Sequence, residues 1–319
     1  TCALPICMVG NNACGAHSLV YGSTRDHTLE ITALLSDATK VTFRSLTSDE
    51  FKVKCYQDDL EGRIYNKISD ILRDANNREE IRNNYPDPRL ERRNTGYALD
   101  LLLDTQPFQE KGTPFNLCKL LAGSEGTLAF STEIKLNLVP IPPKEKALVC
   151  IHCNSLEEAF KANLIALKHN PVAVELIDHF IIERTVDNIE QRKNRFFIKG
   201  EPAAILVVEF ALHTIEAIDE AARLLVQDMQ TAGYGYHYPV VKGNDISRAL
   251  RKAGLGLLSN IKGDKKPVAV IEDTAVLPEL LPAYMEEFAA MLQQYDLNCV
   301  YYAHIATGEL HLRPVLDLK

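Results

Sequence analysis

Short apolar strands alternate with long helical segments through the second half of the chain, and this alternation limits the fold more than any other feature. The alternation begins after Pro140-Ile-Pro-Pro143, a proline-rich linker. The order is strand, helix, strand, strand, helix, strand, which is the split arrangement of ferredoxin-like domains, so we expect an α+β fold. The predicted strands cover residues 147–152, 172–177, 203–210 and 236–241, and the predicted helices cover 156–167, after a cap at Asn154, and 215–233.

The first half of the chain has a different pattern. Residues 29–35 and 41–43 flank a turn at 36–38 and predict a strand hairpin. The polar stretch 48–93 predicts a helical insertion that prolines interrupt near its end. A turn-and-strand unit over 119–139 then leads to the linker. We therefore expect two domains, 7–141 and 145–319, the second continuing through a strand at 268–276, a helix at 278–294 and a strand at 297–305.

Composition excludes several classes of protein. A net charge of -8 argues against nucleic-acid binding, which needs a clustered basic surface. No apolar stretch of the sequence reaches the length of a membrane helix, and the first residues lack the pattern of a signal peptide. The eight cysteines are spread too thinly for a disulfide framework. We expect a cytoplasmic protein and leave open whether its full-length form associates peripherally with the inner membrane.

Cys150 and Cys153 form the one CxxC pair of the sequence. A metal or redox site would need a turn that brings both thiols together, whereas the residues around this pair alternate as in a strand. We therefore interpret both as ordinary strand cysteines.

Two glycine-rich segments precede predicted strands, Gly10-Asn-Asn-Ala-Cys-Gly15 with Tyr21-Gly22 behind it, and Gly123-Ser-Glu-Gly-Thr127. Glycine lets backbone N–H groups approach a phosphate or a flavin ring, and asparagine tolerates left-handed turns. Either segment could be an ordinary tight turn, but two separated loops are harder to dismiss than one. Neither matches GxGxxG or GxxxxGK(S/T), so a Rossmann fingerprint and a P-loop are both disfavoured.

Two histidines near the end of the chain, His304 and His311, flank a glycine turn. They can face one divalent metal across a bent strand pair, with Glu309 as a candidate carboxylate. Two ligands make an incomplete site, so structural or surface histidines stay an alternative. Arg251 lies in a mostly apolar helical segment, where it suits bidentate capture of a carboxylate but is equally typical of a solvated helix face.

In this order, these segments resemble the FAD-linked oxidases of the vanillyl-alcohol oxidase superfamily, with PCMH-type FAD-binding domains. The nearest branch holds D-lactate dehydrogenases, glycolate oxidase flavin subunits and D-2-hydroxyglutarate dehydrogenases. The resemblance implies part of the FAD-binding domain followed by a ferredoxin-like C-terminal cap domain. The strings that carry it are Met8 to His17, Tyr21 to Asp26, Arg93 to Tyr97, Gly123 to Leu128, Arg251 to Gly254, Glu272 to Val276 and the pair His304 and His311.

The resemblance also implies roles for individual residues. FAD would be lined by Gly10, Asn11, Asn12, Cys14, Gly15, Tyr21, Gly22, Gly123, Ser124, Gly126 and Thr127, with Asn94, Gly96 and Tyr97 supporting the pocket. Arg251 and Lys266 would bind the substrate carboxylate. His304 and His311 would hold a divalent metal, which we expect to be zinc.

The sequence also departs from the family pattern. Where the family usually has Gly-Asp-Gly-Asn between the two histidines, this chain has Ala306-Thr-Gly-Glu309, which looks like the long bacterial forms fused to iron–sulfur domains. Glu309 could supply a ligand or act in catalysis. We also expect a fragment that lacks an earlier FAD loop and a later Glu-His-Gly segment with a third ligand and the catalytic base. Residues 1–6 are interpreted as a non-native artefact, because they match an in-frame reading of sequencing-adapter DNA.

The activity implied is oxidation of a small D-2-hydroxy acid such as D-lactate, D-2-hydroxyglutarate or glycolate. FAD would accept a hydride while a metal polarises the hydroxyl. Electrons would pass to a quinone or to iron–sulfur clusters on an absent C-terminal part, since no cysteine cluster of this sequence could hold one. The alternatives are a non-redox flavoenzyme of the same fold, such as an ether-lipid synthase, and a catalytically inactive fragment.

Overall fold

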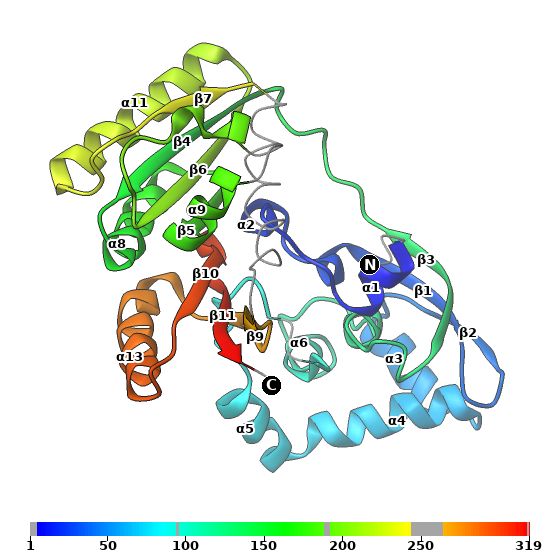
Figure 1. The fold of residues 1–319 in the computed structure, drawn as a ribbon. Helices are drawn as coiled ribbons and strands as arrows, with labels where there is room; N and C mark the ends of the chain where they lie inside the picture. Colours follow the sequence, from blue (N-terminus) through cyan, green and yellow to red (C-terminus); the bar gives the residue numbers. More distant parts are fainter. Residues whose placement is uncertain (1–4, 94–95, 188–191, 244–263, 318) are drawn as a thin grey trace. The chain divides into compact units, whose positions relative to one another are not determined.

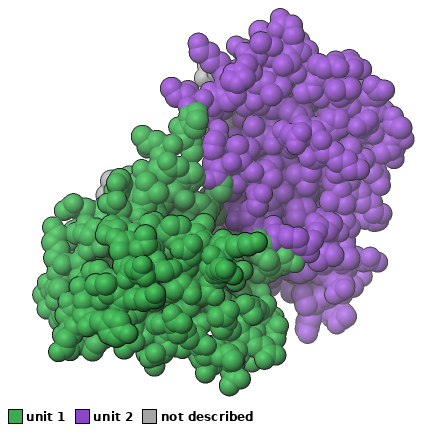
Figure 2. All heavy atoms as spheres, turned by 180° about the vertical axis from the view of Figure 1, so that it is seen from behind, with its two compact units in different colours: residues 1–15, 22–88, 93–140 green, residues 16–21, 89–92, 141–319 purple. Residues whose placement is uncertain are grey.

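The computed structural model of the chain describes residues 5–93, 96–187, 192–243, 264–317 and 319 (Figure 1). The chain divides into two compact units, which have separate colours in Figure 2. The short segments Ala16–Tyr21 and Arg89–Arg92 belong to the second unit although their neighbours in sequence belong to the first. Unit 1 contains Thr1–Gly15, Gly22–Pro88 and Arg93–Pro140, and unit 2 contains Ala16–Tyr21, Arg89–Arg92 and Ile141–Lys319.

Unit 1 is built around a three-stranded antiparallel sheet with the order β2-β1-β3. The predicted hairpin is confirmed, with β1 at Thr28–Leu34 and β2 at Lys40–Phe43 joined through a turn in which Ala38 has a φ of 65°. Strand β3, Phe130–Leu136, pairs with the other edge of β1. The short helices of unit 1 are α1 Pro5–Gly10, η1 Thr24–His27, α6 Leu99–Leu103 and α7 Cys118–Leu121.

The predicted insertion of unit 1 folds into three helices, α3 Ser48–Cys55, α4 Leu60–Arg73 and α5 Ala75–Asn84. Helix α4 begins where Asp59 accepts a hydrogen bond from the N–H of Gly62 at 2.7 Å. Its apolar face turns inward because Tyr65, Ile68 and Leu72 recur at helical spacing. The helical part ends at Asn84, earlier than the predicted 93, since Pro86 and Pro88 follow.

Unit 2 contains one large sheet whose strands have the order β7-β4-β6-β5-β10-β11-β8, with β9 paired to β11. The first four strands, with α8 and α11, form the antiparallel βαββαβ arrangement that the sequence predicted, so the ferredoxin-like fold is confirmed. These strands are β4 Glu145–Cys153, β5 Ala173–Asp178, β6 Ala204–Leu212 and β7 Val240–Lys242, and the later strands are β8 Lys265–Pro267, β9 Ile271–Ala275, β10 Cys299–His304 and β11 Glu309–Asp317.

Helices cover both faces of the first four strands of this sheet, which explains why its strands are apolar throughout. One face packs against α8 Leu156–Ala166 and α11 Ile215–Ala232, while α13 Leu281–Gln294 packs against α8 and against β10. The opposite face packs against α9 His179–Asp187 and η3 Lys193–Phe197. Cys150 and Cys153 lie on opposite faces of β4, and burial raises the pKa of each thiol to about 12, so the strand interpretation is confirmed. The shorter elements of unit 2 are α2 Ser18–Tyr21, η2 Leu167–His169, η4 Pro278–Leu280 and η5 Ile305–Thr307.

Three predicted details of unit 2 are wrong. The N-cap of α8 is Ser155 rather than Asn154, because the Ser155 hydroxyl accepts the N–H of Glu158 at 3.1 Å. The strand predicted at 236–241 is shortened to Val240–Lys242, and the one predicted at 268–276 begins only at Ile271. The backbone hydrogen bonds next to β7 and β9 are irregular, and an apolar sequence pattern does not reveal such irregularities.

Candidate functional site

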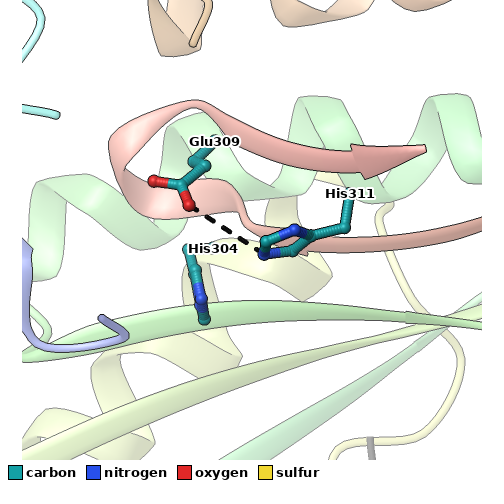
Figure 3. Close-up of side chains that lie close together, drawn as sticks. All are labelled: His304, Glu309 and His311. Atoms are coloured by element: carbon teal, nitrogen blue, oxygen red, sulfur yellow. Dashed lines mark ion pairs between the residues drawn. The ribbon is translucent and has the colours of Figure 1, made fainter. Parts of the chain in front are cut away.

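The hairpin of β10 and β11 brings His304, Glu309 and His311 together in unit 2 (Figure 3). His304 ends β10 and faces Glu309, the first residue of β11, in the strand register. The connection is η5 followed by Gly308, whose φ of 73° lies in the left-handed region. One potential ligand atom from each of the three side chains lies within 4.8 Å of the others. The sequence prediction that the two histidines converge is therefore confirmed for their geometry.

Two carboxylates orient the histidine rings. Nδ1 of His304 lies 2.8 Å from Oε1 of Glu175, a buried residue of β5. Nδ1 of His311 lies 2.6 Å from Oε2 of Glu272 on β9. When each Nδ1 donates its proton to the carboxylate, Nε2 is left as the acceptor that a metal ion requires. Histidine ligands in metalloenzymes are commonly supported by a carboxylate in this way.

Two polar atoms of this hairpin are buried without a hydrogen-bond partner among the described residues. They are Nε2 of His311 and Oε1 of Glu309, which lie 3.9 Å apart and are joined by the dashed line in Figure 3. Buried acceptors of this kind are rare unless a water or an ion completes them. The donor set of two imidazoles and a carboxylate therefore fits a divalent cation. A second group, Glu272, Asp273 and His311, is also close enough, but there Nδ1 of His311 already bonds Glu272.

Burial governs the charge state of the site. It raises the pKa of Glu309 to about 7; the nearby Arg92 guanidinium acts in the opposite direction, and the neighbouring Asp273 carboxylate raises the pKa further. Burial lowers the pKa of His311, so its imidazole is neutral at pH 7, the form that can ligate a metal. Arg92 forms an ion pair with Glu309, and Nε of Arg313 donates to Oε1 of Glu272 at 2.8 Å.

The two glycine-rich loops lie side by side in unit 1. The N–H of Gly123 donates to the carbonyl of Val9 at 2.9 Å, and the N–H of Glu125 donates to that of Gly10 at 2.8 Å. Gly123, Glu125 and Gly126 all have positive φ values. A Cβ at Gly10 or Gly126 would meet nothing within 4 Å, so the backbone there is open to a ligand. This open, paired backbone fits the approach of a phosphate or a flavin ring.

Arg25 holds these loops in place, a function that the sequence did not reveal. The buried guanidinium donates to the carbonyl of Ala122 through Nε at 3.1 Å and Nη2 at 2.8 Å, and Nη2 also lies 3.3 Å from the carbonyl oxygen of Gly96. Its backbone N–H donates to Oδ1 of Asn12 at 2.8 Å. Three segments that are far apart in sequence therefore meet at this one residue.

The structure places the other predicted flavin residues as follows. The hydroxyl groups of Tyr97 and Thr127 lie 2.7 Å apart, and the Thr127 hydroxyl donates to the carbonyl of Ser124 at 2.6 Å. Gly22 has a φ of 67° and lies against Asp26, so it shapes the turn before η1. Asn11, Cys14 and Gly15 lie on the loop after α1 in unit 1, whereas Tyr21 belongs to unit 2, and Asn94 lies outside the described residues.

The two predicted carboxylate-binding residues are not seen together at the histidines. Arg251 lies outside the described residues. Lys266 is an exposed residue of β8 that pairs with Leu316. That position is five residues along β11 from His311, or roughly 16 Å at the usual rise of a strand.

Comparison with known proteins identifies the family. Residues 142–319 match the family described as FAD linked oxidases, C-terminal domain. The chain is 32% identical over 323 residues to the D-2-hydroxyglutarate dehydrogenase of Escherichia coli strain K12, covering 98% of this chain and 31% of that protein. It is 23% identical over 310 residues to the D-lactate dehydrogenase of Archaeoglobus fulgidus, covering 97% and 53% respectively.

The fold comparison agrees. The solved structure of p-cresol methylhydroxylase with substrate bound has a TM-score of 0.54 at 11% identity, covering 98% of this chain and 55% of that one. This likeness shows a shared fold, and the family match defines the class of the protein as an FAD-linked oxidase. The chain belongs to the FAD-linked oxidase family, as its motifs predicted.

Two further facts bear on function. The chain spans about a third of the length of the Escherichia coli relative. None of the helices in the described parts of the chain combines the length and the apolar character that crossing a membrane requires.

Proposed function

We propose that the protein to which this chain belongs oxidises a small D-2-hydroxy acid to the 2-oxo acid with FAD as its cofactor. The observation that carries the proposal is the cluster of His304, Glu309 and His311, in which both rings are backed by carboxylates. Membership of the FAD-linked oxidases supports the flavin, and relatives named D-2-hydroxyglutarate dehydrogenase and D-lactate dehydrogenase support the substrate class.

Different residues of the chain would bind the metal, the flavin and the substrate. His304, His311 and Glu309 would hold a divalent cation, which when bound lowers the pKa of a substrate hydroxyl. The open backbone at Gly10 and Gly126 would receive FAD, which when bound supplies the hydride acceptor. Arg251 would bind the substrate carboxylate and so fix which hydrogen of the substrate is presented, whereas Lys266 lies too far along β11 from His311 for a small acid to contact both.

Tyr302 restrains the side chains of this cluster. Tyr302 stacks against the His311 ring, with ring centroids 5.6 Å apart and an interplanar angle of 26°. Its hydroxyl donates to Glu175, the residue that supports His304. The ring of Tyr302 therefore limits rotation of one histidine while its hydroxyl fixes the partner of the other.

The proposal is tested with the intact gene product, purified and kept free of oxygen. We expect a yellow protein whose visible flavin absorption is bleached by D-2-hydroxyglutarate or D-lactate and not by the L-enantiomers. Re-oxidation by a quinone or through iron–sulfur centres would identify the electron acceptor. A bound flavin that no 2-hydroxy acid reduces would overturn the proposal and would favour a non-redox flavoenzyme of the same fold.

A further inference from the structure

A buried ion pair joins Arg92 to Glu309 inside unit 2. The side chains of the two residues are only 4% and 1% exposed, and Nε of Arg92 contacts Oε2 of Glu309. Arg92 ends the short segment Arg89–Arg92, which belongs to unit 2 although it is surrounded in sequence by unit 1. A buried ion pair contributes little net stability because two charges lose their hydration. The pair is therefore better explained by a function other than stability.

The pair leaves the two oxygens of the carboxylate in different environments. Oε2 is held by Arg92, whereas Oε1 is buried without a hydrogen bond among the described residues and lies 3.9 Å from Nε2 of His311. Nε2 of His311 also has no hydrogen-bond partner there. A pair that served packing alone would not need to leave two buried acceptors, Oε1 of Glu309 and Nε2 of His311, close to each other.

We propose that Arg92 is a positioning residue for a metal site: it fixes Glu309 through Oε2, so that Oε1 joins His304 and His311 as a further protein ligand of a divalent cation. This inference rests on the proposed function.

A positive guanidinium beside a cation needs compensation, and the site provides it. Carboxylates outnumber guanidinium groups around the two histidines. The carboxylates are those of Glu175, Glu272, Asp273 and Glu309, and the guanidinium groups are those of Arg92 and Arg313. The cluster therefore keeps a negative excess that a divalent cation can balance, even with Arg92 in contact.

The test measures the affinity of the metal-free, flavin-loaded intact protein for Zn²⁺ by competition with a chromophoric chelator. Arg92→Gln should weaken Zn²⁺ binding by about 10- to 100-fold, the usual effect of removing a group that orients a ligand. Arg92→Lys should restore part of the affinity, since one ammonium donor can still hold Oε2. Arg89→Gln is the matched control, because Arg89 pairs with Glu279 on the surface and its loss should leave Zn²⁺ affinity unchanged.

A double-variant cycle separates positioning from a structural effect. In a Glu309→Gln background, Arg92→Gln should weaken Zn²⁺ binding no further, because its effect passes through Glu309. A loss that adds to that of Glu309→Gln would overturn the inference. The flavin spectrum and the thermal midpoint of the zinc-free variants show that each is folded.

The role of Arg92 and the metal site itself can be refuted separately. Normal Zn²⁺ affinity in Arg92→Gln, together with its loss in His311→Ala, would remove the role of Arg92 and leave the metal site standing. Zn²⁺ affinity that His311→Ala does not weaken would remove the metal site of the proposed function, and the role of Arg92 with it.

Discussion

Nδ1 of His304 lies 2.8 Å from Oε1 and 2.9 Å from Oε2 of Glu175, on the neighbouring strand β5. The carboxylate is almost fully buried and also accepts the hydroxyl of Tyr302. A buried acid in the middle of a sheet costs folding free energy unless its partners repay it. The pairing of β5 with β10 supplies those partners and makes Glu175 part of the candidate metal site.

The first prediction follows from this contact. Glu175→Gln should weaken Zn²⁺ binding by about 10- to 100-fold, because an amide orients the His304 ring less firmly than a carboxylate does. Chelator competition measures the effect. Glu183→Gln is the matched control, since Glu183 pairs with His179 on the exposed surface of α9. Equal affinities in the two variants would show that Glu175 has only a structural role.

The second prediction concerns the ligand itself. His304→Ala should lower turnover of the intact protein by on the order of 1000-fold, because a metal ion contributes several kcal/mol to stabilising a developing oxyanion. FAD should remain bound, since the proposed flavin loops belong to unit 1. The ratio of flavin to protein and the steady-state rate are measured together. His169→Ala, which removes a histidine paired with Asp228, should leave both unchanged. Loss of flavin in His304→Ala would show that the site is wrongly assigned.

Much of unit 2 could be predicted because its strands and helices differ strongly in period. Helix α11 was predicted from Ile215 to Gly233 and runs from Ile215 to Ala232, with Gly233 in the left-handed conformation that ends helices. The N-cap of α8 could not be placed, because Asn154 and Ser155 are adjacent and both suit that position. The sequence pattern therefore predicted helix α8 but not the residue that caps it.

The partners in the site could not be predicted, because they depend on strand order. Glu175 was visible as a lone acid in an apolar strand, which is the best signal that the sequence offered. Its partner is set by the pairing of β5 with β10, and no local pattern encodes that pairing. Arg92 and Arg25 lie in irregular segments, and only the tertiary fold shows what they contact.

The third prediction concerns the turn of the metal hairpin. Gly308→Ala should destabilise the protein by about 3 kcal/mol, since the residue has a φ of 73° and an added Cβ would overlap the carbonyl of Val276. Gly233→Ala is the control for conformation alone. Gly233 has a φ of 74° but open space around its Cβ, so its loss should cost only about 1 kcal/mol. Urea unfolding measures both, and equal costs would contradict the predicted overlap.

The fourth prediction concerns the flavin loops. Arg25→Met should weaken FAD retention by at least about tenfold, because the carbonyl groups of Ala122 and Gly96 lose their donors at a cost of about 1–3 kcal/mol. Flavin release during dialysis is the measurement. Arg44→Met is the control, as it removes an exposed arginine of unit 1 that pairs with Glu50. Tight FAD binding in Arg25→Met would mean that the loops keep their shape without this side chain.

The fifth prediction concerns pH and Asp178, the last residue of β5. Burial raises its pKa from the ordinary value of 3.8 to about 6, although the N–H groups of Ile181 and Tyr301 donate to it at 2.9 and 2.7 Å. A raised folded-state pKa means that the folded chain binds this proton more tightly than the unfolded chain does. The contribution of Asp178 to the free energy of unfolding is therefore fully present below pH 4 and is lost as the pH rises through 6.

This dependence can be isolated by comparison with Asp178→Asn, which cannot titrate. The difference in the free energy of unfolding, native protein minus variant, should fall by up to about 3 kcal/mol between pH 4 and pH 7. Urea unfolding at several pH values measures it. Asp219→Asn, at an exposed residue of α11 that pairs with Lys242, should show no such fall. A difference that stays constant or rises across this range would show that the hydrogen bonds to Asp178 outweigh its burial, so that its pKa is not raised.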